Sequence, residues 1–197
     1  MRSFKAVLAL LTLLCPTLSA GEPSYRKAAV EAARWIQASA IATDQGTAWP
    51  ADPRDAKSVN HTLYAGTSGV VLFFIEAWRS TGDQSFLKDA RAGGDHLLVA
   101  LAAEKDLGLY TGVAGIGFAL TEAFKATGDV KYKEGAVRCA RLVEQRAQKA
   151  GKGIEWNETT DIISGGAGIG LFLLYAAREL KEPNLRELAI QGAYRLI

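Results

Sequence analysis

A short glycine-rich phrase occurs three times in the chain and constrains the fold more than any other feature. Its copies span residues 63–69 (LYAGTSG), 109–115 (LYTGVAG) and 162–168 (IISGGAG). Each copy opens an apolar run of helical length, and in the first two copies this run ends in Thr-Gly-Asp. Successive phrases are 46 and 53 residues apart. Repeats of this length that carry two helical patterns are typical of stacked helical hairpins.

Two kinds of predicted helix alternate along the chain. After a first helix over 24–42 and a long loop over 43–62, nearly all-apolar helices alternate with helices that have one polar face. The apolar helices are predicted over 70–79, 115–126 and 168–180, and the amphipathic helices over 84–103, 131–150 and 184–197. An all-apolar helix is buried, whereas an amphipathic helix has one face in solvent. No segment shows sustained strand alternation, so the sequence predicts an all-α fold, an α/α toroid of helical hairpins with inner and outer helix layers.

The Thr-Gly-Asp tripeptides fit the corners between the two layers. Gly82 and Gly128 can adopt the left-handed conformation that ends a helix, and Asp83 and Asp129 can cap the helix that follows. The glycine phrases fit the other end of each hairpin, because small residues allow helix starts to approach one another closely. We therefore expect the starts of all inner helices to meet at one rim.

The first 20 residues have the three parts of a secretory signal peptide. Arg2 and Lys5 are followed by an apolar run over 6–14, and Ala20 precedes the expected cleavage site. The run is too short to span a bilayer, and no later stretch is long enough. We expect a secreted or periplasmic protein without a stable membrane span after leader removal; an uncleaved anchor is the alternative.

Charge and cysteine content exclude some classes of protein. Without Arg2 and Lys5 the 23 basic residues fall to 21, which equals the 21 acidic residues. This balance argues against a nucleic-acid partner, which normally requires a basic excess. After leader removal Cys139 is the one cysteine, so neither an internal disulfide nor a cysteine-rich zinc site is expected. Its position in a helical pattern favours a buried structural thiol.

The phrases over 109–117 and 161–170, combined with Thr-Gly-Asp at hairpin spacing, resemble the lanthionine synthetase C-like (LanC-like) family. The resemblance covers roughly residues 24–197. It implies a closed α/α toroid. The family's cyclases use a zinc ion, held by two cysteines and a histidine, to activate a cysteine thiol of a precursor peptide. The thiolate then adds to a dehydrated serine or threonine and forms a thioether ring.

The chain departs from this family pattern in three ways. The family's zinc ligands lie in its C-terminal half, in phrases that this chain lacks, so we expect no cofactor here and zinc only in a longer protein with those ligands. Three full hairpins are also too few to close a ring. We therefore interpret residues 21–197 as the N-terminal portion of a LanC-like toroid, incomplete in this chain. The leader is the third departure, since lantibiotic cyclases work inside the cell.

Four residues are candidates for a functional site. Asp161 matches a position where the resemblance implies a cavity-facing acid that assists proton transfer; a helix-capping acid is the alternative. His61 lies in a loop at the expected rim and could bind substrate, bind metal or move a proton, or be a surface histidine. Trp49 and Trp156 lie in loops before glycine phrases, where they suit stacking on sugar rings and equally suit capping of the core.

These features leave three functions open. The first is a secreted, peptide-modifying LanC-like protein of the thioether-forming kind, which we expect to be incomplete or inactive as this chain because the zinc ligands are absent. The second is a carbohydrate-active α/α toroid, such as a glycoside hydrolase or epimerase, in which carboxylates beside tryptophans provide general acid–base chemistry. The third is a non-catalytic helical-repeat binding protein. The expected partner is accordingly a peptide or a carbohydrate.

Overall fold

The computed structural model describes residues 25–195, which form an all-α fold. The helices of this part of the chain are α1 (Tyr25–Ala38), α2 (Thr67–Thr81), α3 (Gln84–Ala100), α4 (Val113–Thr127), α5 (Val130–Gln145), α6 (Gly166–Glu179) and α7 (Asn184–Ala193). Two 3₁₀ turns, η1 (Ala56–Ser58) and η2 (Leu101–Ala103), lie in the connections. Two short antiparallel hairpins complete the structure: β1 (Ile41–Thr43) with β2 (Gly46–Ala48), and β3 (Gln148–Ala150) with β4 (Gly153–Glu155).

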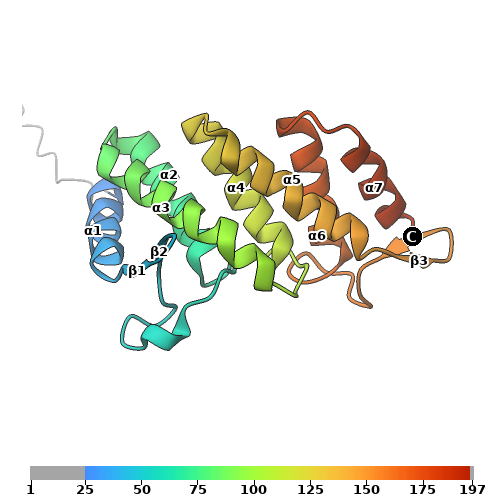
Figure 1. The fold of residues 1–197 in the computed structure, drawn as a ribbon, viewed down its shortest axis with the longest axis horizontal. Helices are drawn as coiled ribbons and strands as arrows, with labels where there is room; N and C mark the ends of the chain where they lie inside the picture. The colour runs from blue at the N-terminus through green and yellow to red at the C-terminus, as the bar shows by residue number, and fades with distance from the viewer. Residues whose placement is uncertain (1–24, 196–197) are drawn as a thin grey trace, which may run out of the picture.

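Helices α2 to α7 form three hairpins that stand side by side in sequence order (Figure 1). The apolar helices α2, α4 and α6 make one layer, in which α4 contacts both neighbours, and α3, α5 and α7 pack outside them. The inner layer supplies much of the core, including Phe74, Ile116, Leu120, Ile169 and Phe172. The predicted two-layer α/α toroid architecture is thus confirmed, with the described hairpins forming an open row.

The predicted corners between the layers are also confirmed. Gly82 and Gly128 have φ angles of 76° and 71°, the left-handed region that a glycine adopts at little cost. The carboxylate of Asp83 then accepts a hydrogen bond from the Ser85 N–H at 2.9 Å, which caps α3. Asp129 caps α5 in the same way.

The glycine phrases form tight loops at the opposite end of each hairpin. In the second loop the Val113 N–H donates to the Asp106 carbonyl oxygen at 2.8 Å, so the chain folds back on itself. A Cβ added to Gly112 would lie 2.0 Å from that oxygen, and a Cβ on Gly115 would lie 2.2 Å from the Leu109 carbonyl oxygen. Side chains at either position would overlap the backbone, which explains the spacing of the glycines within the phrase.

Both β-hairpins were missed by the sequence prediction. The helix predicted over 131–150 ends at Gln145, and residues 148–155 form β3 and β4; the loop predicted over 43–62 similarly contains β2. Each strand has three residues, too short to show a two-residue alternation. Gly46, the first residue of β2, and Gly151, in the turn between β3 and β4, have φ angles of 133° and 58°. The first and last helices also end earlier than predicted, at Ala38 and Ala193.

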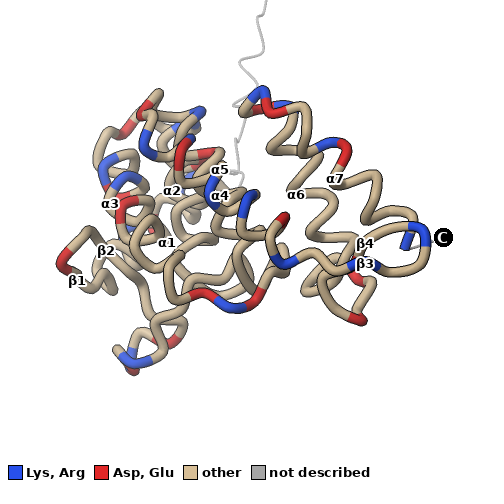
Figure 2. The backbone as a smooth tube through the Cα atoms, turned by 45° about the vertical axis from the view of Figure 1, so that its right-hand side comes forward, with Lys and Arg blue, Asp and Glu red and all other residues tan. Residues whose placement is uncertain are grey.

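The proposed leader, residues 1–20, lies outside the described residues. Within 25–195, no helix combines the length and apolar character that crossing a bilayer requires. Basic and acidic residues are interspersed along this part of the backbone, while α6 is free of charge over most of its length (Figure 2).

Candidate functional site

The three glycine loops lie next to one another and form a continuous rim. The Tyr64 N–H donates to the Tyr110 carbonyl oxygen at 3.2 Å, and the Tyr110 N–H donates to the Ile163 carbonyl oxygen at 2.9 Å. These three residues occupy equivalent positions in the three repeats. Their side chains are exposed, with Tyr64 78% accessible to solvent. We call residues 60–66, 106–112 and 159–165 the glycine-loop rim; it presents a row of apolar side chains.

An apolar recess of about 370 Å³ adjoins the first loop of this rim. Helix α1, the connection after β2, the first glycine loop and α2 all contribute to its wall. The larger lining side chains are Trp35, Trp49, Pro53, Leu63, Tyr64 and Phe73. No charged side chain lines it. The recess is therefore suited to a bulky apolar group rather than to an ion.

Asp161 lies at the rim, in the turn that leads into α6. Its Oδ1 accepts hydrogen bonds from the Ile163 N–H (2.5 Å) and the Ser164 N–H (2.8 Å). The hydrogen bond from Ser164 is the main cause that lowers the pKa of the exposed Asp161 carboxyl below its usual range. The carboxylate is ionised at neutral pH and accessible, and it also holds the turn together.

Both tryptophans of the predicted site lie in the core. Trp49 is 2% exposed and Trp156 is 9% exposed. The indole N–H of Trp49 donates to the Ile36 carbonyl oxygen at 3.0 Å, and that of Trp156 donates to the Val143 carbonyl oxygen at 2.9 Å. So little of either ring reaches solvent that neither offers a face for stacking on a sugar. Trp49 forms part of the wall of the recess, and Trp156 does not. Of the two roles left open by the sequence, the structure shows core capping.

His61 lies on the first loop, and the structure brings it together with His96 of α3. Their Nε2 atoms are 3.3 Å apart. Glu104 Oε2 lies 4.0 Å from His61 Nδ1, and Thr43 Oγ1 lies 3.2 Å from His96 Nδ1. Partial burial lowers the pKa of His61 despite Glu104, and burial together with His61 lowers the pKa of His96. Both imidazoles are therefore neutral at pH 7.

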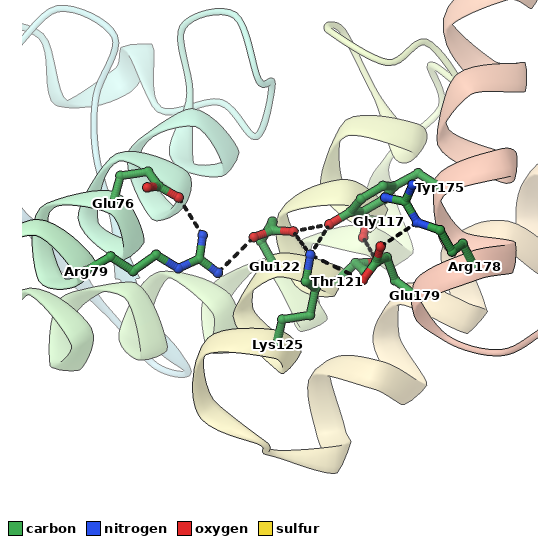
Figure 3. A network of polar contacts seen from close by, with 9 residues as sticks. All are labelled: Glu76, Arg79, Gly117, Thr121, Glu122, Lys125, Tyr175, Arg178 and Glu179. Atoms are coloured by element: carbon green, nitrogen blue, oxygen red, sulfur yellow. Dashed lines mark hydrogen bonds and ion pairs between the residues drawn. The ribbon is translucent and has the colours of Figure 1, made fainter.

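A ladder of charged and hydroxyl groups connects the inner helices near their C-terminal ends (Figure 3). Arg79 of α2 contacts Glu122 of α4 at 3.1 Å, and Lys125 contacts the same carboxylate at 2.9 Å. Tyr175 of α6 donates its hydroxyl to Glu122, and Lys125 pairs with Glu179 at 3.2 Å. Burial and the Glu122 hydrogen bond raise the pKa of Tyr175 to about 12. The ladder fixes the register of adjacent repeats.

The model of the lanthionine synthetase C-like protein family matches residues 57–197 of the chain. The chain belongs to this family. The match includes all three glycine loops and all three hairpins. None of the curated proteins compared with the chain matches it. The resemblance seen in the glycine phrases and the Thr-Gly-Asp corners is thus confirmed at the level of the family.

The described residues of this LanC-like chain do not fit the zinc site implied by the family's cyclases. That site requires two cysteines and a histidine, whereas the one cysteine described, Cys139, is fully buried in α5. Burial raises the pKa of the Cys139 thiol well above its usual range, which disfavours the thiolate that binds zinc. Within residues 25–195 no group of three or more His, Cys, Asp or Glu residues could hold a metal ion.

Sequence reasoning missed the partner of His61 and the charged ladder. No local sequence pattern connects His96 of α3 with a loop 35 residues earlier. The ladder did have a signal: Glu76, Glu122 and Tyr175 each lie ten residues after the first loop glycine, and Arg79, Lys125 and Arg178 each lie thirteen residues after it. Recurrence of polar residues at fixed places in otherwise apolar helices indicates a shared role.

Proposed function

We propose that this chain forms the peptide-binding N-terminal part of an exported LanC-like protein that modifies peptides by thioether formation. In that reaction a cysteine thiol adds across the double bond of a dehydrated serine or threonine. The thiol proton moves to the neighbouring carbon, so the product is an isomer of the substrate. Under this proposal, a zinc site of the type used by the family's cyclases lies in a longer form of the protein, which carries the cysteine and histidine ligands.

The apolar recess beside the first glycine loop is the observation that carries this proposal. Its volume of about 370 Å³ lies within the usual range for ligand pockets. Its uncharged wall suits one large apolar side chain of a peptide, and the neighbouring row of Tyr64, Tyr110 and Ile163 extends the apolar surface along the rim. An extended peptide could thus anchor one residue in the recess and follow the rim.

Export is proposed from the leader over residues 1–20. N-terminal sequencing of the protein from the extracytoplasmic fraction is the direct test. A new N-terminus at Gly21 is expected; an intact Met1 in the mature protein would contradict export by cleavage.

The carbohydrate hypothesis depends on exposed tryptophans, and burial of Trp49 and Trp156 removes that support. The non-catalytic hypothesis predicts the same peptide-binding surface without turnover. Thioether formation by the longer protein would distinguish our proposal from the non-catalytic hypothesis. The measurement is loss of a free thiol, detected by alkylation, at unchanged peptide mass.

Peptide binding can be tested by isothermal titration calorimetry with matched probes. One probe carries a cysteine, a dehydroalanine and a phenylalanine, and the second has aspartate in place of phenylalanine. We expect the purified chain to bind the first probe more tightly, because the recess offers no partner for a carboxylate. Tyr64→Ala and Trp35→Ala should each weaken binding by about 1–2 kcal/mol, or roughly 5- to 30-fold.

Tyr25→Ala is the matched control, since it removes an exposed aromatic side chain from α1 that does not line the recess. Its affinity should equal that of the unchanged chain. Equal loss in all three variants, or equal affinity for both probes, would show that the recess is not the binding site. Tighter binding of an oligosaccharide than of either peptide would favour the carbohydrate hypothesis instead.

A further inference from the structure

The geometry points to a binding site for one divalent late transition-metal ion, such as Zn²⁺, between the Nε2 atoms of His61 and His96. This site is distinct from the cysteine-containing site implied by the family. It is also independent of the proposed peptide recess.

The separation of the two nitrogens is the first argument. The Nε2 atoms lie 3.3 Å apart, and the ring centroids 5.3 Å apart. In a tetrahedral zinc site each metal–nitrogen bond is about 2.0–2.1 Å, which places two imidazole nitrogens about 3.3 Å from each other. An ion can therefore bind both rings with little movement of either.

The partners of the other ring nitrogens are the second argument. Metal-binding histidines usually donate their remaining N–H to a carboxylate or another oxygen, which fixes the ring and its tautomer. Thr43 Oγ1, 3.2 Å from His96 Nδ1, is already such a partner. Glu104 Oε2, 4.0 Å from His61 Nδ1, must approach by about 1 Å to accept a hydrogen bond from it. With both Nδ1 atoms protonated, the two Nε2 lone pairs face each other and require a shared cation.

Without metal the same pair can share a proton. The Thr43 hydroxyl can donate or accept, so His96 can move its proton to Nε2 and donate to His61 Nε2. Metal binding then moves the His96 proton to Nδ1, where it is donated to Thr43. The change involves only a tautomer, which allows the site to form from the metal-free geometry.

The backbone around the site holds both rings in place. The Ser68 hydroxyl, at the start of α2, donates to the His61 carbonyl oxygen at 2.6 Å. His96 lies within α3, one turn before that helix ends at Ala100. The side chain of His61 is 26% exposed, so an ion has access and water can occupy the remaining coordination positions. Two protein ligands define an open site of moderate affinity.

The chain has only these two histidines, which makes the test direct. Zn²⁺ is titrated into the purified chain, without a polyhistidine tag, by calorimetry and by ¹H–¹⁵N spectroscopy of the imidazoles. We expect one ion per chain and a shift of both Nε2 resonances, with a proton retained on both Nδ1 atoms. Absence of saturable binding, or a shift of one imidazole alone, would overturn the proposal.

Variants identify the contribution of each residue. His61→Ala and His96→Ala should each weaken zinc binding by at least tenfold, and Glu104→Gln by about 10- to 100-fold, the usual effect of removing a partner of a ligand. Glu158→Gln, which changes an exposed carboxylate just before the third loop, should leave affinity unchanged. Zinc binding that survives loss of both histidines would be adventitious and would refute the site. Tyr64→Ala should not alter zinc affinity, which separates this test from that of the peptide recess.

Circular dichroism of each variant verifies folding. If a histidine variant does not fold, the imidazole resonances of the unchanged chain decide the question alone, because they report on both rings without substitution.

Discussion

Replacing Trp156 with alanine tests whether this side chain belongs to the core. Trp156 is 9% exposed and lies between the end of α5 and α7. Its indole N–H donates to the Val143 carbonyl oxygen at 2.9 Å. Its ring packs against Gly192 so closely that an added Cβ there would lie 2.7 Å from it. The side chain therefore joins the second hairpin to the third.

The size of the effect follows from this burial. An aromatic side chain of this kind buries about 150–250 Å², which at about 25 cal/mol per Å² corresponds to about 4–6 kcal/mol. Measured costs of truncating buried tryptophan or phenylalanine to alanine are about 3–5 kcal/mol, which includes incomplete collapse of the cavity. We expect a loss of about 3–5 kcal/mol, equivalent to a decrease in Tm of about 6–20 °C for a chain of this size.

The assay is urea unfolding followed by circular dichroism, because the substitution changes tryptophan fluorescence. A shift of the midpoint at unchanged slope would identify a loss of stability. Trp35→Ala is the matched control: Trp35 is 61% exposed on α1, and its removal should cost less than about 1 kcal/mol. If Trp156→Ala cost no more than Trp35→Ala, the core assignment would be refuted and an exposed stacking role restored.

Two further substitutions test the inner ladder and the rim. Glu122→Gln should destabilise the chain by about 1–2 kcal/mol at pH 7, since it removes the charge shared by Arg79 and Lys125. Burial raises the pKa of Glu122, but hydrogen bonds from Tyr175, Lys125 and Arg79 outweigh it, so the pKa in the folded chain lies below the usual 4.5. The stability that ionised Glu122 contributes is therefore present at neutral pH, and it is lost as the pH falls from 4.5 through the folded-state pKa. Urea titrations at pH 7 and pH 3 should thus show a smaller gap between the two proteins at pH 3, and a constant gap would contradict the ladder. Asp161→Asn keeps an oxygen that accepts from the Ile163 and Ser164 N–H groups, so the free energy of unfolding should change by less than about 1 kcal/mol. If Asp161 transfers a proton, the same substitution should lower the rate of thioether formation by the proposed longer protein about 100-fold or more.

The helical architecture was predictable because its causes are local. Apolar and amphipathic runs alternate with a helical period, and the corner residues Gly82 and Asp83 have side-chain and backbone properties that end one helix and start the next. The hairpin over 148–155 was not predictable in this way. Its strands have three residues each, and Gly153 approaches the Gln191 carbonyl oxygen in α7, so its place depends on tertiary contacts.

The site was less predictable, because sequence position does not show which side of a loop faces the core. Trp49 and Trp156 do precede glycine phrases, as a rim residue would, but both indole N–H groups turn inward to helix carbonyl oxygens. His61 was placed on the correct loop. Its partner His96 could not be found, since the contact between them requires the packing of that loop against α3.

The three glycine loops differ in the groups that hold the turn before the inner helix. Thr62, Gly108 and Asp161 each lie four residues before the first glycine of their glycine phrase. Thr62 holds its turn with a neutral hydroxyl, which accepts from the Ala65 N–H at 3.1 Å, and Gly108 has no side chain at all. In these two loops the backbone also closes the turn, because the Gly66 N–H donates to the Thr62 carbonyl oxygen at 3.1 Å and the Gly112 N–H to the Gly108 carbonyl oxygen at 3.0 Å. In the third loop the Asp161 carboxylate accepts from the Ile163 and Ser164 N–H groups. An acceptor oxygen at position 161 thus has a structural role that asparagine would keep, so a loss of reaction rate in Asp161→Asn at unchanged stability is the result that would assign the exposed carboxylate to proton transfer.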